Sequence, residues 1–224
     1  MLKLSAASRT FLFSACLACA AASAPAQATL YGPSPYTSSA DSPFFPFTGY
    51  SYFYLETFED GAFNVPGVTA TGPGLCITSV NCPFPPSATD SVENGAAGHN
   101  HWANGSITYA FDANALGALP TDVGIVWTDG VNPITFQAFD AQNVLIGTLI
   151  GNHADGVFTG TTAEDRFYGV RNAGGVSRIV ISDPGGIEVD DLQYGLASAV
   201  PEPGTLALLA TGLGALALRR RRRI

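Results

Sequence analysis

Residues 176–194 read VSRIVISDPGGIEVDDLQY, and this stretch carries the pattern that decides the fold. Two runs rich in β-branched residues, 176–181 and 187–194, flank the tetrapeptide Asp183-Pro184-Gly185-Gly186. Short β-branched runs bounded by Asp, Pro and Gly are typical of strands joined by turns. The stretch therefore predicts two strands with a turn between them.

The same alternation of strand and turn continues upstream. Further strand-like runs occur at 51–58, 106–111, 123–127, 134–139, 144–150 and 166–171, with turn signals at 128–130 and 172–175. Only residues 113–119 suggest a helical turn, and there is no internal repeat. About 150 residues suffice for one two-sheet core. We therefore predict an all-β protein with a single, jelly-roll-like β-sandwich over 51–198, preceded by an irregular Pro- and aromatic-rich segment over 29–50.

The N-terminus has the order of a secretory signal. Lys3 and Arg9 precede an apolar run over 11–22, and Ala26-Gln27-Ala28 offers small residues for cleavage. This order predicts a signal peptide over 1–28 and export across the inner membrane. A cut after Ala24, a lipoprotein and a buried N-terminal helix are the alternatives.

Removal of that segment leaves two cysteines, Cys76 and Cys82. An even pair in an oxidising compartment predicts a local disulfide, which for so short a ring contributes about 2–3 kcal/mol. A metal-binding pair is the alternative, but no second pair of cysteines completes four ligands.

The charge of the body is strongly one-sided. Between residues 29 and 198 the only basic residues are three arginines, and no lysine is present, whereas acidic residues run from Asp41 to Asp191. An acidic surface repels phosphate backbones, so we expect no nucleic acid as a partner.

The C-terminal residues 199–224 have three parts. Pro201, Glu202 and Pro203 hold an extended backbone, and an uncharged apolar run over 204–218 follows them. The run spans about 22 Å as a helix, short of a hydrocarbon core of roughly 30 Å. Basic residues after it keep the chain end cytoplasmic and the body outside. These topology determinants are Arg219, Arg220, Arg221, Arg222 and Arg223.

This tripartite tail resembles the PEP-CTERM sorting signal. The resemblance implies that a membrane-embedded exosortase recognises Pro201-Glu202-Pro203 and removes the tail after a transient stay of the short helix in the inner membrane. Signal peptidase and exosortase would then be the processing partners, and the mature chain would become periplasmic, surface-bound or extracellular. A permanent C-terminal anchor is the alternative.

The strand region opens with 55–61 and closes with 187–195, and this frame resembles the jelly-roll sandwiches of exported carbohydrate-binding and galactose-binding-like modules. In such folds the first and last strands often lie side by side. The resemblance implies a structural calcium ion shared by acidic side chains of both strands. The candidate ligands are Glu59, Asp60, Asp190 and Asp191, and solvated turn carboxylates are the alternative reading of them.

No catalytic motif stands out. His99, His101 and His153 offer imidazoles for a transition metal, but the first two lie in a Gly/Asn-rich stretch, and loop histidines are common. Nucleophile-elbow, zinc-protease and phosphate-loop patterns are missing from the sequence. We assign no catalytic residue and no cofactor beyond structural calcium.

Two functions from different classes follow. The first is a non-catalytic matrix or surface protein that binds extracellular polysaccharide, with Trp102, Trp127 and Tyr168 as candidates for an aromatic platform. The second is a secreted enzyme acting on extracellular polysaccharide, which requires a cleft with two facing carboxylates. A purely structural role without a ligand is not separable from the first by sequence.

Overall fold

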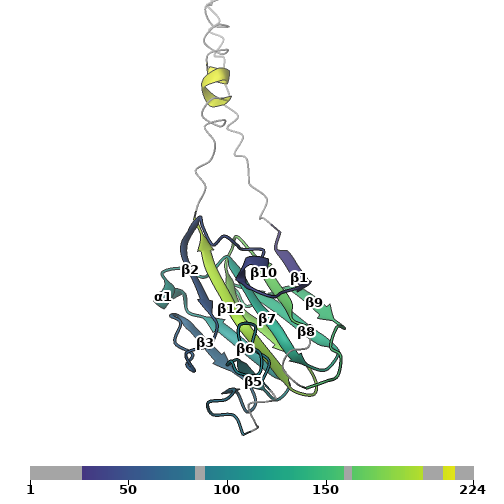
Figure 1. Ribbon diagram of the computed structural model, residues 1–224. Helices are drawn as coiled ribbons and strands as arrows, with labels where there is room; N and C mark the ends of the chain where they lie inside the picture. Colours follow the sequence, from purple (N-terminus) through teal and green to yellow (C-terminus); the bar gives the residue numbers. More distant parts are fainter. Residues whose placement is uncertain (1–26, 84–88, 159–162, 199–208, 215–224) are drawn as a thin grey trace, which may run out of the picture.

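The computed structural model describes residues 27–83, 89–158, 163–198 and 209–214 (Figure 1). The expected sorting motif at Pro201-Glu202-Pro203, the arginines 219–223 and all but the last two residues of the expected signal peptide lie outside these ranges. Of the apolar run 204–218, only residues 209–214 are described, and they are helical. None of the helices formed by the described residues combines the length and the hydropathy that a membrane crossing needs.

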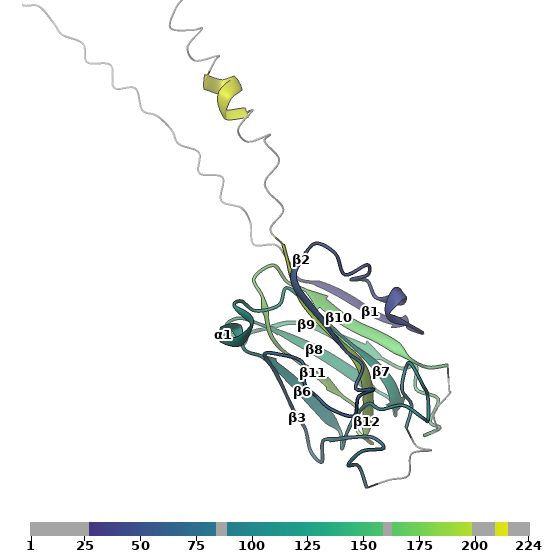
Figure 2. The same ribbon diagram turned by 60° about the vertical axis from the view of Figure 1, so that its left-hand side comes forward.

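The body is a mostly-β sandwich of two sheets, as predicted (Figures 1 and 2). The seven-stranded sheet has the order β1-β10-β7-β12-β5-β4, and β2 also pairs with β12. Its strands are β1 (Thr29–Pro35), β2 (Tyr50–Glu56), β4 (Cys76–Ile77), β5 (His101–Ala103), β7 (Asp122–Gly130), β10 (Arg166–Arg171) and β12 (Ile187–Ala197). The five-stranded sheet has the order β3-β6-β11-β8-β9. Its strands are β3 (Val68–Thr71), β6 (Ser106–Phe111), β8 (Ile134–Asp140), β9 (Leu145–Gly151) and β11 (Val176–Ser182).

Several details differ from the sequence expectation, and the short strands β3 and β4 lie in segments for which no strand was predicted. Residues 29–35 are not irregular but form the edge strand β1. Proline is tolerated there because an edge strand has a neighbouring strand on one side only, so the missing N–H of proline breaks no hydrogen bond on the other side. Residues 128–130 do not turn but complete β7. His101 leaves the expected loop and begins β5. The expected helical turn is present as α1 (Ala113–Leu116), and a short 3-10 helix, η1, spans Ser39–Asp41.

The central strands β7 and β12 are buried on both faces. The inner face packs against the five-stranded sheet through residues such as Trp127, Val189 and Tyr194. On the outer face, Tyr36 and Phe44 from the segment after β1 pack on Val126 and Phe167. This double cover explains why β7 is a continuous buried run rather than an alternating one.

The ladder also fixes which end of the sheet each chain end occupies. Thr29 pairs with Arg171, Arg171 with Asp122, and Asp122 with Gly195, so β1 begins and β12 ends in one row (Figure 1). Gly130 pairs with Ile187 eight residues further along β7, about 26 Å away. The start of β12 therefore lies at the opposite end of the sandwich.

Candidate functional site

Strand β12 carries a line of acidic side chains on the outer face of its sheet. Ile187 and Val189 belong to the inner core, so Glu188 and Asp190 point the other way because side chains alternate along a strand. Both carboxylates are buried. The line continues across β7, where Asp129 pairs directly with Glu188.

A β-bulge adds a third carboxylate to this line. Between Asp190 and Gln193 the pairing with β7 slips, so that Asp191 and Leu192 share one partner position. Asp191 has a φ of 45°, a left-handed conformation that Asp tolerates better than β-branched residues. The bulge re-aims Asp191, and its backbone N–H donates to Asp190 Oδ1 at 2.8 Å.

Three carboxylates converge at one point beside the bulge. One oxygen from each of Glu59, Glu93 and Asp190 lies within 4.8 Å of the other two. Glu59 follows β2, which pairs with β12 as the sequence frame suggested, and Glu93 lies in the loop over 89–100. We call Glu59, Glu93, Asp190 and the adjoining Asp191 the acidic cluster.

Asp191 is completely buried, and its two oxygens differ. Oδ2 accepts a 2.5 Å hydrogen bond from the Tyr36 hydroxyl, which in turn accepts one from Gln193 Nε2. Oδ1 is also buried, and no N–H group or hydroxyl of the described residues donates to it. Partial burial and the charge of Asp191 raise the pKa of Glu93 to about 8. At neutral pH Glu93 therefore keeps its proton and hydrogen-bonds to Asp191, so a bound cation would displace this proton.

The three arginines of the body are engaged elsewhere. Arg171 pairs with Asp122, and Arg178 lies over the Phe139 ring at 3.5 Å. Arg166 donates to the carbonyls of Ala163 and Asp165. A side-chain cation of these described arginines therefore does not neutralise the acidic cluster, and an all-oxygen donor set of this kind suits a hard divalent ion such as calcium.

The predicted ligand set is brought together in part. Glu59, Asp190 and Asp191 meet, whereas Asp60 turns away and accepts from Asn64 Nδ2 at 2.7 Å and from the Ala62 N–H. Glu93 was missed because it lies in a loop without hydrophobic periodicity. The same carboxylates anchor that loop, since Asp190 accepts from the Val92 N–H and Glu59 from Asn94 and the His99 N–H.

A cavity of about 280 Å³ opens next to the acidic line, at the end of the sandwich where β12 begins. Trp102 on β5 pairs with Glu188, and Glu188 pairs with Asp129, so the three side chains form one row across three strands. The indole of Trp102 and the half-exposed ring of Phe158 line the cavity together with both carboxylates. Gly186 beside the indole has a φ of +127°, a backbone conformation that would be strained for any residue with a side chain.

The two cavity carboxylates are held differently. Glu188 Oε2 accepts from Asn100 Nδ2 at 2.7 Å and from the Asp90 N–H at 2.9 Å. Asp129 Oδ1 accepts from the Gly130 N–H. Burial and the charge of Glu188 raise the pKa of Asp129 to about 8, and burial raises the pKa of Glu188 to about 7. The cavity therefore combines aromatic walls with two carboxyl groups that repel each other when ionised.

The other aromatic and histidine residues singled out in the sequence are buried or half-buried. Trp127 and Tyr168 are fully buried, whereas Trp102 is half-buried and is the platform candidate that lines the cavity. His101 Nδ1 lies 2.8 Å from the Tyr109 hydroxyl, and His153 Nε2 lies 2.7 Å from that of Tyr168. The metal-binding geometry found among the described residues contains no histidine.

The predicted disulfide between Cys76 and Cys82 is confirmed. Cys76 pairs with Trp102 in the ladder between β4 and β5, so the disulfide lies at the edge of the strand that carries the indole. It pins the loop beside the cavity rather than the centre of the fold.

The comparisons with known proteins address the tail and the fold. Residues 199–223 match the model of the PEP-CTERM protein-sorting motif. The chain carries this motif. The motif marks an exported protein with a C-terminal sorting region, in agreement with the sequence analysis.

Two solved structures resemble the body distantly. A "Xylan-Binding Domain from CBM 22, formally x6b domain" is 13% identical with a TM-score of 0.32, covering 70% of this chain and all of that one. "TmCBM61 in complex with beta-1,4-galactotriose" is 18% identical with a TM-score of 0.30, and the match covers 63% of this chain and 91% of that one. No curated protein matches the chain.

Proposed function

We propose that this protein is sorted by an exosortase to the cell envelope or extracellular matrix, where its β-sandwich binds polysaccharide without cleaving it. The observation that carries the binding part is the cavity in which Trp102, Glu188 and Asp129 form one row. Aromatic faces stack on the apolar faces of sugar rings, and carboxylates accept hydrogen bonds from hydroxyl groups. The volume of about 280 Å³ accommodates a small ligand group such as one sugar unit.

The acidic cluster has a supporting role in this proposal. Glu59, Glu93 and Asp190, with the buried Oδ1 of Asp191 nearby, would hold a calcium ion. A bound cation would displace the proton of Glu93 and neutralise the carboxylates that ionise around it. The ion would also connect the loop over 89–100 to β12 at Asp190, which lies two residues after Glu188. The ion would thus stabilise one wall of the site rather than take part in chemistry.

Affinity electrophoresis of the full-length chain through gels containing a panel of soluble polysaccharides tests the binding. We expect retardation by at least one polymer, and loss of retardation in Trp102→Ala. Phe45→Ala is the matched control, because this ring is 52% exposed and lies outside the cavity. A wild-type chain that migrates freely with every polymer, or a Trp102→Ala chain that is retarded equally, contradicts the proposal.

Cell fractionation with intact-mass measurement tests the sorting. The wild type should lose its C-terminal segment and leave the inner membrane, whereas a chain with Pro201, Glu202 and Pro203 changed to alanine should stay there uncut. If both chains keep the apolar run and remain in the inner membrane, the protein is a permanently anchored envelope protein instead.

The second candidate function is hydrolysis of a polysaccharide. The observation in its favour is that Asp129 and Glu188 line the same cavity, as the two carboxyl groups of a glycosidase must. Against it, two donors already bind Glu188 Oε2. Release of new reducing ends from a retarding polymer, abolished by Asp129→Asn, would establish the hydrolase.

A further inference from the structure

The cavity that we propose as the polysaccharide site holds two carboxyl groups, and a neutral sugar would not neutralise them when they ionise. Asp129 and Glu188 are 2% and 4% exposed and directly opposed on paired strands. The arginines of the body are engaged elsewhere, and the described lining of the cavity contains no basic side chain. Two adjacent buried carboxyl groups without a cation are costly whenever both ionise.

The aromatic walls point to the kind of cation. An ammonium group placed between a carboxylate and an indole face gains both an ion pair and a cation–π contact, and the carbon skeleton that carries it can pack on Trp102 and Phe158. A bare metal ion would use the carboxylates and leave the aromatic walls without a role. An organic cation uses both halves of the lining.

We infer that the cavity selects sugars bearing a free amino group, so that the ligand is a polysaccharide with unacetylated hexosamine units. This inference rests on the proposed function and specifies its ligand. The ammonium group would lie between Asp129 and Glu188 while the sugar ring stacks on Trp102. Acetylation removes the charge, and the acidic body, with three arginines and no lysine between residues 29 and 198, repels polymers of uronic acids.

Calorimetric titration of the full-length chain, in a polyoxyethylene detergent free of sugar groups, tests the selection with three probes of equal length. These are a β-1,4-linked glucosamine trimer, its fully N-acetylated counterpart and a galacturonic acid trimer. We expect the glucosamine trimer to bind at least 10-fold more tightly than the acetylated trimer, and the uronate trimer to bind most weakly.

Asp129→Asn keeps the shape of the cavity and removes one of its two charges. We expect it to abolish the preference for the amine, so that the ratio of the two trimers' dissociation constants falls to about one. Asp112→Asn is the matched control: it removes one negative charge at the N-cap of α1, outside the cavity lining, and Asn caps a helix as well as Asp does. This variant should retain the full preference. Glu188→Gln is the second cavity variant, used if Asp129→Asn does not fold.

The outcomes separate the two proposals. Equal binding of the amine and acetyl trimers, or a preference that persists in both cavity variants, overturns the inference and leaves polysaccharide binding standing. Absence of binding by all three probes, together with free migration through every polymer gel, overturns both. A preference that Asp112→Asn also loses would assign the effect to overall charge and overturns the inference.

Discussion

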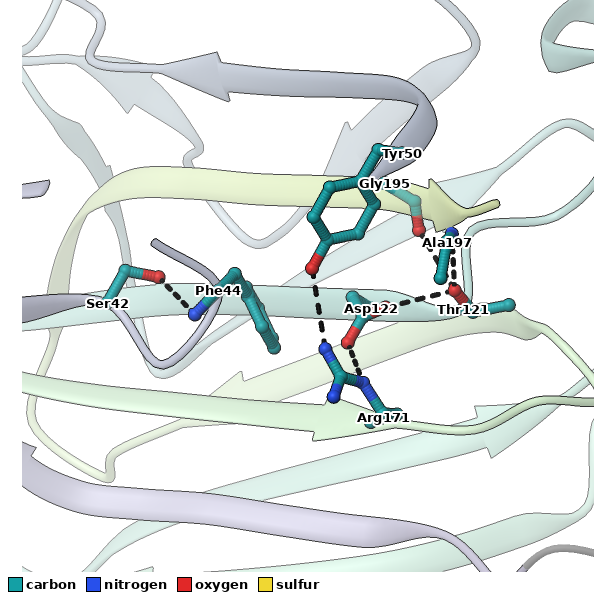
Figure 3. Close-up of polar contacts among 8 residues, drawn as sticks. All are labelled: Ser42, Phe44, Tyr50, Thr121, Asp122, Arg171, Gly195 and Ala197. Atoms are coloured by element: carbon teal, nitrogen blue, oxygen red, sulfur yellow. Dashed lines mark hydrogen bonds and ion pairs between the residues drawn. The ribbon is translucent and has the colours of Figure 1, made fainter. Parts of the chain in front are cut away.

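Arg171 Nε lies 2.5 Å from Asp122 Oδ1 and joins β10 to β7 in the row where β1 begins and β12 ends (Figure 3). This contact is a salt bridge between side chains in different environments. The Asp122 side chain is fully buried, whereas that of Arg171 is about half exposed. Thr121 Oγ1 donates to Asp122 Oδ2 and accepts from the Ala197 N–H, which links the pair to the last residue of β12.

Removing the cation from this pair should destabilise the body. In Arg171→Met, Asp122 stays buried without its partner, and we expect the free energy of unfolding to fall by about 2–4 kcal/mol in urea titrations. Arg178→Met, which removes an arginine that contacts the Phe139 ring rather than a buried carboxylate, should cost only about 1 kcal/mol. The double change Arg171→Met with Asp122→Asn should recover much of the loss. Equal effects of the two single changes would contradict this assignment.

Calcium should stabilise the folded chain through the acidic cluster. At a free calcium concentration of 100 times the dissociation constant, binding adds about 2.7 kcal/mol to the free energy of unfolding. Chelation of the calcium should remove this gain. Differential scanning calorimetry with and without the ion measures the effect. Asp190→Asn should abolish it and Asp60→Asn should keep it, because Asp60 is bound to Asn64 and lies outside the cluster. A calcium response that survives in Asp190→Asn would rule out this site.

The hydroxyl of Tyr36 should anchor the segment after β1. It bonds to the buried Asp191 and Gln193, so Tyr36→Phe leaves both without that partner and should cost about 1–3 kcal/mol. Limited proteolysis should then cut residues 37–49 faster. Tyr54→Phe serves as the comparison, because Tyr54 is half-buried and its ring contacts Tyr194. A Tyr36→Phe chain as stable and as resistant as wild type would show that the aromatic packing alone holds the segment.

Acid should destabilise the fold through His101. Burial lowers the pKa of His101 to about 4, whereas an unfolded histidine has a pKa near 6.5. The unfolded chain therefore binds more protons between these pH values, and the contribution of His101 to stability falls as the pH falls. The stability of wild type minus that of His101→Gln should decrease by up to about 1.4 kcal/mol per pH unit from 6.5 to 4, and stay constant above 7.5. A flat difference would mean that His101 has the same pKa in the folded and unfolded chains, and would contradict its burial as a neutral imidazole.

Reduction of the Cys76–Cys82 disulfide should weaken ligand binding more than the fold. The loop it closes is short, so its loss should cost only about 2 kcal/mol. Cys76 is the ladder partner of Trp102, however, and a looser β4 would let the indole move. We expect dithiothreitol to reduce retardation in the polysaccharide gels while circular dichroism stays unchanged. Unchanged retardation after complete reduction would separate the disulfide from the site.

A strand could be predicted from the sequence only where its residues show a β-branched or aromatic run. The eight strands with β-branched or aromatic runs were predictable, as was their assembly into a sandwich. Strand β1 was missed because Pro33 and Pro35 signal irregular chain, and only its place at a sheet edge makes them acceptable. Glu59, Asp190 and Asp191 were predictable as neighbours from the frame of first and last strands. Glu93 was not, because only the bulge at Asp191 and the loop it contacts bring it there.

The path of β12 has a mechanical consequence. Its first residues line the cavity, and its last, Ala197, lies two residues before the sorting motif. A pull between a held polymer and a retained tail would run along this one strand. Because β7 flanks β12 on one side and β2 and β5 on the other, the hydrogen bonds of both ladders would be loaded together in shear, not opened one by one. The strand that carries the site would thus also transmit the tension between the bound polymer and the tail.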